Sequence, residues 1–99
     1  MSFHVRITRG AQEDLERLLD HRAAVDYTAA RRARTAIERG YGFLAEMPFA
    51  CRKVDDANPF LRELLISFGD SGHIGLFEIE DRTTVTVLAV RHQREDDYH

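Results

Sequence analysis

The amino-acid sequence predicts an α+β fold with the element order β-α-α-β-β-β, in which a helical hairpin packs on a small antiparallel sheet. Two stretches with apolar residues at helical spacing fill most of the first half of the chain. Three apolar runs separated by turn-sized polar gaps fill most of the second half. With 99 residues and 43% apolar side chains, the chain fits one domain spanning residues 1–99.

The first strand and the first helix follow each other directly. Phe3, Val5 and Ile7 alternate with polar residues, which is typical of a strand with one buried face. Thr8 is placed to cap a helix that we expect to run to about residue 24. The apolar stripe of this helix consists of Ala11, Leu15, Leu18 and Leu19.

The second helix begins at Asp26 or Thr28, either of which can cap it, and ends before Pro48. Its inward stripe consists of Ala30, Ala33, Ile37, Tyr41 and Leu44. Its outward face carries Arg31, Arg32, Arg34 and Arg39. Gly40 and Gly42 each cost about 1 kcal/mol relative to alanine inside a helix, so we expect this part to bend or to pack closely against a neighbour.

The second half begins with a loop, predicted over residues 48–61 because no period is maintained there and Asn58-Pro59 indicates a turn. Strands then begin at Arg62, His73 and Thr84. Gaps at residues 69–72 and 80–83 have hairpin length. A charged tail follows the last strand.

Composition excludes several classes of protein. The net charge of −3, with Lys53 as the only lysine, leaves room for a local arginine site for anions but gives no overall basic surface for nucleic acid. The single cysteine, Cys51, excludes an intrachain disulfide. The first residues lack the apolar core of a secretory signal, and no apolar run approaches the length of about 18 residues that spans a bilayer. We therefore expect a cytoplasmic protein.

Four sequence pieces, taken in their order and spacing, resemble the RelE/ParE toxin superfamily of type II toxin–antitoxin systems. They are Ala11…Asp14-Leu15, Pro48…Cys51-Arg52, Arg62-Glu-Leu, and Val87-Leu-Ala-Val-Arg-His92. The tail from Arg91 to His99 resembles that of the plasmid-stabilisation, ParE-like branch. The resemblance implies a toxin held inactive by a cognate antitoxin, with which it forms a hetero-oligomer. ParE-like members poison DNA gyrase, whereas RelE-like members cut messenger RNA in the ribosomal A site.

An mRNA endonuclease needs groups that activate a 2′-hydroxyl and stabilise a charged phosphate. If the chain is RelE-like, the resemblance implies that Arg62, Arg91, His92 and Tyr98 are catalytic. Arg62 then holds a phosphate; alternatively it pairs with Glu63, Glu78 or a carboxylate of the tail. If the chain is a nuclease, His92 is an acid or base; the alternative is that His92 belongs to an ion-pair cluster on the surface.

A protein target is favoured by the acidic residues that follow, since Glu95, Asp96 and Asp97 repel an RNA backbone. In the ParE-like interpretation the chain is not an enzyme and binds its target through Arg91, His92, Arg94, Glu95 and Asp96. The alternative is a frayed terminus without a role. A superfamily member that has lost its toxicity and persists as a binding module is the third possibility.

Antitoxin binding is predicted for two kinds of residue. Arg31 and Arg34 provide positive charge for an acidic segment or else belong to a solvated helix face. Phe49 and Phe60 provide apolar surface for a groove or else belong to the core and its rim. We expect no cofactor and no metal, because His92, Asp96 and His99 lie on a tail that does not form a preformed tetrahedral site.

Overall fold

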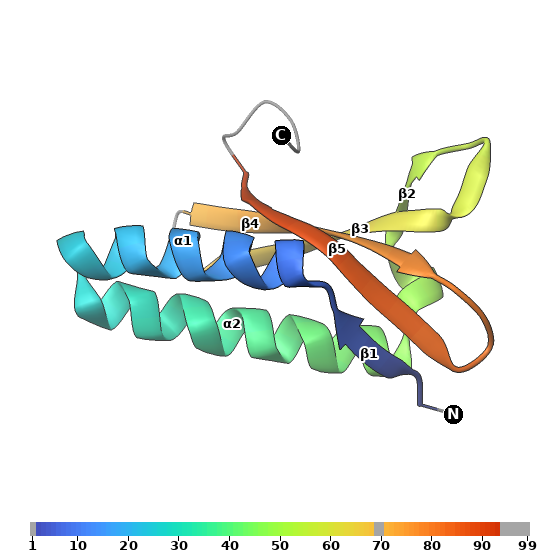
Figure 1. Ribbon diagram of the computed structural model, residues 1–99, viewed down its shortest axis with the longest axis horizontal. Coiled ribbons are helices and arrows are strands. Elements are labelled where there is room, and N and C mark those ends of the chain that lie inside the picture. Colours follow the sequence, from blue (N-terminus) through green and yellow to red (C-terminus); the bar gives the residue numbers. More distant parts are fainter. Residues whose placement is uncertain (1, 69–70, 94–99) are drawn as a thin grey trace.

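In the computed structural model, which describes residues 2–68 and 71–93, two helices cover one face of a five-stranded sheet (Figure 1). The elements are β1 (His4–Ile7), α1 (Arg9–Val25), α2 (Tyr27–Glu46), a 3₁₀ turn (Pro48–Ala50), β2 (Arg52–Asp55), β3 (Asn58–Phe68), β4 (Ser71–Ile79) and β5 (Thr84–His92). The predicted α+β fold is confirmed, with the helical hairpin between the first strand and the later ones.

The sheet is mixed rather than wholly antiparallel as predicted. Its strand order is β1-β5-β4-β3-β2, and β1 lies parallel to β5, with Val5 opposite Val85. The Thr8 N–H donates to the Val87 carbonyl at 3.0 Å, so contact with β5 continues to the start of α1. Alternation of apolar residues fixes which face of a strand is buried but does not specify its neighbour or its direction.

An additional strand, β2, lies in the segment predicted to be a loop. Arg52 is opposite Glu63, and an Asp55 carboxylate oxygen accepts a hydrogen bond from the Ala57 N–H at 2.9 Å in the turn that follows. As a result β3 begins at Asn58, four positions earlier than predicted. All residues of β2 are exposed, so no apolar alternation marked it as a strand.

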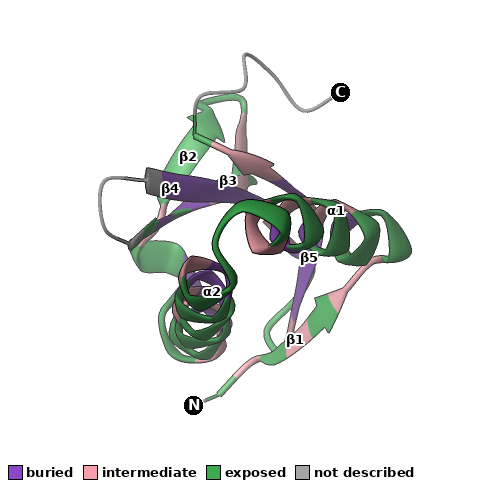
Figure 2. Ribbon diagram, turned by 90° about the vertical axis from the view of Figure 1, so that its left-hand side faces the viewer, coloured by how far each residue is buried: buried purple, intermediate pink, exposed green. Residues whose placement is uncertain are grey.

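The core lies between the helices and the sheet, where Figure 2 shows the buried residues. It is formed by apolar side chains of both predicted stripes and of the helix-facing side of the sheet, including Leu15, Ile37, Phe77, Val87 and Val90. At Gly40, an added Cβ would lie 2.9 Å from Leu64 Cδ2, so α2 packs closely on β3 there. At Gly42, an added Cβ meets no atom within 4 Å.

Both helices begin at residues predicted to cap them. Thr8 Oγ1 accepts a hydrogen bond from the Ala11 N–H at 3.1 Å, and Asp26 Oδ1 accepts one from the Ala29 N–H at 3.1 Å. Each such cap stabilises its helix by about 1 kcal/mol. Neither helix is long and apolar enough to cross a membrane.

Helix α1 is also tied to β5 at a β-bulge. The register shifts so that Leu76 faces Ala89 while Phe77 faces Val87. The pairing of β1 with β5 ends at Ile7 opposite Val87, and beyond it the Val90 N–H donates to Asp14 Oδ2 of α1 at 3.0 Å. A carboxylate therefore occupies a place that a neighbouring strand would fill, and it fixes the last part of β5 against α1.

Candidate functional site

A pair of histidines lies where β5 ends. His73 of β4 faces His92 of β5, with ring centroids 5.4 Å apart in an edge-to-face arrangement. Burial, together with the charges of His92 and Arg22, lowers the pKa of His73 from 6.5 to about 4. His73 is therefore neutral at pH 7 and supports His92 from within the sheet.

The two predicted functional residues at this end face opposite sides of the sheet. His92 lies in a row with His73 and Ile66 on the helix-covered face, whereas Arg91 lies in a row with Ile74 and Leu65 on the other face. Arg91 Nη1 donates to the His92 carbonyl at 3.3 Å. The two side chains are thus neighbours in sequence without facing one common space.

Arg62 is held by backbone oxygens. Its guanidinium donates to the Pro59 carbonyl at 2.8 Å, the Phe49 carbonyl at 3.1 Å and the Cys51 carbonyl at 2.8 Å, and it lies 5.2 Å from the centre of the Phe49 ring. None of these partners is a carboxylate, so the predicted pairing of Arg62 with Glu63 or Glu78 is wrong. The carboxylates of the tail lie outside the described residues. Instead, Arg52 Nε donates to Glu63 at 2.9 Å.

The location of Arg62 separates it from the end of β5. Arg62 faces Phe77, while Ile66 faces His73, so the two rows lie four positions apart in β3. At about 3.3 Å per residue, this separation is roughly 13 Å along the strands. Arg62, Arg91 and His92 therefore do not form one compact group around a reacting phosphate.

The remaining predicted residues of the tail, Arg94, Glu95, Asp96 and Tyr98, lie outside the described residues. Within residues 2–68 and 71–93, no group of at least three His, Cys, Asp or Glu side chains is placed to hold a metal ion. Burial raises the pKa of the Cys51 thiol although Arg62 acts in the opposite direction, so Cys51 is not activated as a nucleophile.

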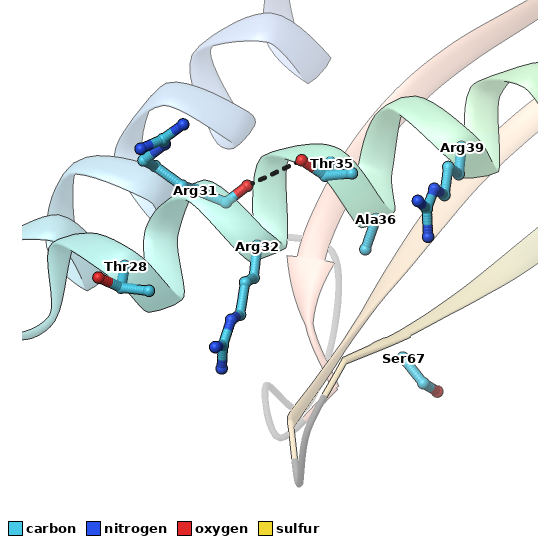
Figure 3. A pocket seen from close by; sticks show the side chains of 7 residues that line it. All are labelled: Thr28, Arg31, Arg32, Thr35, Ala36, Arg39 and Ser67. Carbon is cyan, nitrogen blue, oxygen red and sulfur yellow. Dashed lines mark hydrogen bonds between the residues drawn. The ribbon is translucent and has the colours of Figure 1, made fainter.

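The outward arginines of α2 border an open hollow of about 450 Å³ between α2 and the end of β3 (Figure 3). Arg31 and two further arginines, Arg32 and Arg39, line it together with Ser67 of β3. Arg34, which was predicted with Arg31, is exposed and is not among the lining residues. The spacing of Arg32 and Arg39, seven residues on one helix face, was the sequence signal for this grouping.

Phe49 and Phe60 lie together in a different place, near the turn between β4 and β5. Their rings are 6.3 Å apart in an edge-to-face arrangement, and the side chains are about half exposed. With Phe3 and Ile79 they line a mainly apolar hollow of about 480 Å³. The predicted antitoxin-binding residues therefore divide between two surfaces, one basic and one apolar.

Comparison with known proteins identifies the family. Residues 5–97 match the family described as ParE toxin of type II toxin-antitoxin system, parDE. The chain belongs to the ParE toxin family. A ParE-family toxin has an antitoxin as its partner, so membership of the family implies an antitoxin for this protein. No curated protein sequence matches the chain.

A solved structure supports the fold of this ParE-family chain. The chromosomal ParDE TA system from P. aeruginosa contains a chain that is 17% identical, with a TM-score of 0.71 over 92% of this chain and 96% of that one. At this identity the likeness concerns the fold alone.

Two residues of the ParE-family chain gained a role that the sequence did not indicate. His73 is the third residue of β4 and follows a glycine, where a single histidine has no recognisable motif. Asp14 was recognised only as part of a family-like piece of sequence, yet its carboxylate accepts a hydrogen bond from the Val90 N–H of the distant β5. Neither interaction is periodic in sequence, so only the tertiary structure reveals it.

Proposed function

We propose that this ParE-family toxin acts in the cytoplasm by binding DNA gyrase and stabilising its cleaved complex with DNA, and that it carries out no chemistry of its own. The target-binding residues in this proposal are Arg91 and His92 at the end of β5 and Arg94, Glu95 and Asp96 beyond it. The family match supports a ParE-type toxin rather than a RelE-type nuclease.

The observation that carries the choice is the state of Arg62. Its guanidinium donates to the backbone carbonyls of Phe49, Cys51 and Pro59, and its row lies roughly 13 Å from that of His92. A nuclease requires an arginine and an acid or base within reach of the same phosphate. Arg62 instead supports the segment that leads into the sheet.

The end of β5 is suited to presenting a protein-binding segment. Val90 is fixed to Asp14 by a hydrogen bond, and the Gln93 N–H donates to the Gly72 carbonyl at 2.8 Å. Hydrogen bonds therefore fix the end of β5 as far as Gln93. Mixed charges after Arg91 favour a protein surface over a phosphate backbone.

Purified gyrase and plasmid DNA provide the direct test. We expect the toxin to increase the linear DNA recovered after protein digestion, and Arg94→Ala/Glu95→Ala/Asp96→Ala to reduce this by at least about tenfold with unchanged circular dichroism. Arg9→Ala, on the exposed start of α1, serves as the control and should retain full effect.

Induction in cells distinguishes the ribosomal target. The gyrase proposal predicts a DNA-damage response together with intact messenger RNA. Codon-phased cuts in messages by primer extension, with normal supercoiling and no gyrase effect in vitro, would refute it and assign the chain to the nuclease branch. An absence of any growth defect would indicate a binding module without toxicity and would equally refute it.

A further inference from the structure

The short strand β2 lies at one edge of the sheet, and no described strand lies beside it on its outer side. The strand order places β2 last, next to β3. All four residues of β2 are exposed, as Figure 2 shows. Figure 1 shows the hairpin of β2 and β3 extending beyond the helices, so a strand approaching this edge does not meet α1 or α2. Backbone N–H and C=O groups on such an edge are available for pairing with another chain.

The irregularity in the pairing of β2 with β3 lies in β3. Lys53 faces Arg62, and Asp55 faces Asn58. Between these two pairs β2 has one residue, Val54, whereas β3 has the three residues 59–61. The additional residues of the bulge therefore belong to β3, and β2 itself stays regularly extended. Its outer edge keeps the geometry that pairing with a further strand requires.

The charges along β2 make this strand complementary to a reversed copy of itself. The sequence from Arg52 to Asp56 is Arg-Lys-Val-Asp-Asp, with two cations before Val54 and two carboxylates after it. Antiparallel pairing about Val54 places Lys53 opposite Asp55 of a second copy. The same register places Arg52 opposite Asp56 of that copy. Opposite charges at facing positions stabilise an antiparallel pair.

The charge of Lys53 is not compensated within its own sheet. Its facing residue in β3 is Arg62, which carries a like charge. Among the ion pairs of residues 2–68 and 71–93, none includes Lys53, Asp55 or Asp56. One carboxylate oxygen of Asp55 accepts a hydrogen bond from the Ala57 N–H at 2.9 Å, which leaves the second oxygen for another donor.

We propose that two copies of this chain associate by antiparallel pairing of their β2 strands about a two-fold axis at Val54, which joins the two sheets into one. Lys53 and Asp55 form the central ion pairs between the copies, because Arg52 is already paired with Glu63 of its own chain. Val54, which is 42% exposed, meets Val54 of the second copy at the axis. This proposal is independent of the gyrase-binding function, which concerns the end of β5.

Other occupants fit this edge less well. An acidic segment compensates Lys53 but is repelled by Asp55 and Asp56, and a basic segment has the opposite difficulty. A phosphate backbone meets the same two carboxylates. Short, charged edge strands resist pairing because most incoming strands do not match their charges. A second copy matches the charge order at every position, so the charges that exclude other strands favour this one.

The proposed interface is small. The four paired residues of β2 span roughly 13 Å. Contacts of this size lie at the low end of protein interfaces, below about 1,200 Å² of buried surface, where complexes are transient. We therefore expect a reversible dimer that forms in the range of about 10 µM to 1 mM. A two-fold interface uses the same surface on both copies, so association stops at the dimer.

Sedimentation equilibrium of the purified chain from about 10 µM to 1 mM provides the test. The average mass should rise from 11.4 kDa toward twice this value and no further. Lys53→Asp and Asp55→Lys each place like charges at facing positions, so each should weaken association at least about tenfold. A mixture of the two variants restores both ion pairs and should associate about as strongly as the wild type. Arg34→Asp makes the same charge change on the exposed face of α2 and should stay within about threefold of the wild type.

Hydrogen exchange supplies a second measurement, in which the amides of residues 52–55 should become more protected as the protein concentration rises. A mass that stays at 11.4 kDa throughout the concentration range would overturn the proposal. Association that survives in both variants, or that their mixture does not restore, would place the contact outside β2 and count equally against it. Growth of the mass beyond the dimer would exclude a closed two-fold pair. None of these results depends on the outcome of the gyrase assay.

Discussion

The buried histidine of β4 should make the stability of this protein depend on pH. His73 is 4% exposed, and its pKa is lowered from 6.5 to about 4 by burial and by the charges of His92 and Arg22. Because the folded pKa lies below the unfolded one, the unfolded chain binds the proton more readily. The stabilisation is therefore fully present above about pH 6.5 and is lost as the pH falls toward 4.

The magnitude follows from the two pKa values. A difference of about 2.5, at about 1.4 kcal/mol for each pKa unit, gives a maximum loss of about 3 kcal/mol. With the same values, the loss is about 1.4 kcal/mol at pH 5.5 and about 2.5 kcal/mol at pH 4.5. Such losses are large beside the unfolding free energy of about 5–15 kcal/mol that is typical of a folded domain.

Urea unfolding followed by circular dichroism at pH 7.5, 5.5 and 4.5 measures this loss. His73→Leu removes the titrating ring and should flatten the difference, even if the variant is less stable at pH 7.5. His21→Gln replaces an exposed histidine of α1 and should keep the wild-type dependence. Carboxylates titrate alike in all three proteins, so wild-type and His73→Leu curves that run parallel from pH 7.5 to 4.5 would refute the reasoning.

The other predictions concern stability measured by thermal and urea unfolding. Gly42→Ala should stabilise the protein by about 1 kcal/mol because the added Cβ enters open space. The Gly40→Ala variant should be at least about 1 kcal/mol less stable than the Gly42→Ala variant because its Cβ meets side chains of β3. Equal effects would contradict the close packing of α2 on β3. Arg62→Ala should lower the free energy of unfolding by about 2 kcal/mol, because backbone carbonyls lose their donor. Arg52→Ala removes an exposed ion pair and should cost at most about 1 kcal/mol. A larger loss in Arg52→Ala than in Arg62→Ala would contradict the structural role of Arg62. Tyr41→Phe should be neutral or stabilising by up to about 1 kcal/mol. The buried Tyr41 hydroxyl has no hydrogen-bond partner among the described residues, and burial raises its pKa to about 12. A loss of stability above about 1 kcal/mol would reveal such a partner.

The sequence predicted the elements whose burial is periodic. The stripes of α1 and α2 and the caps at Thr8 and Asp26 were identified because helix geometry repeats in sequence. The exposed strand β2 was not, because all of its residues face solvent. The parallel pairing of β1 with β5 was not predicted either, since it depends on where α1 packs rather than on any pattern within the strand.

The same distinction applies to the candidate site. Arg62 was recognised as important from its position before a strand, but its partners were predicted to be carboxylates and are carbonyls of Phe49, Pro59 and Cys51. Every residue has a carbonyl, so such partners leave no trace in composition or spacing. Charge on α2 was visible in the sequence, whereas its position beside Ser67 of β3 required the tertiary structure.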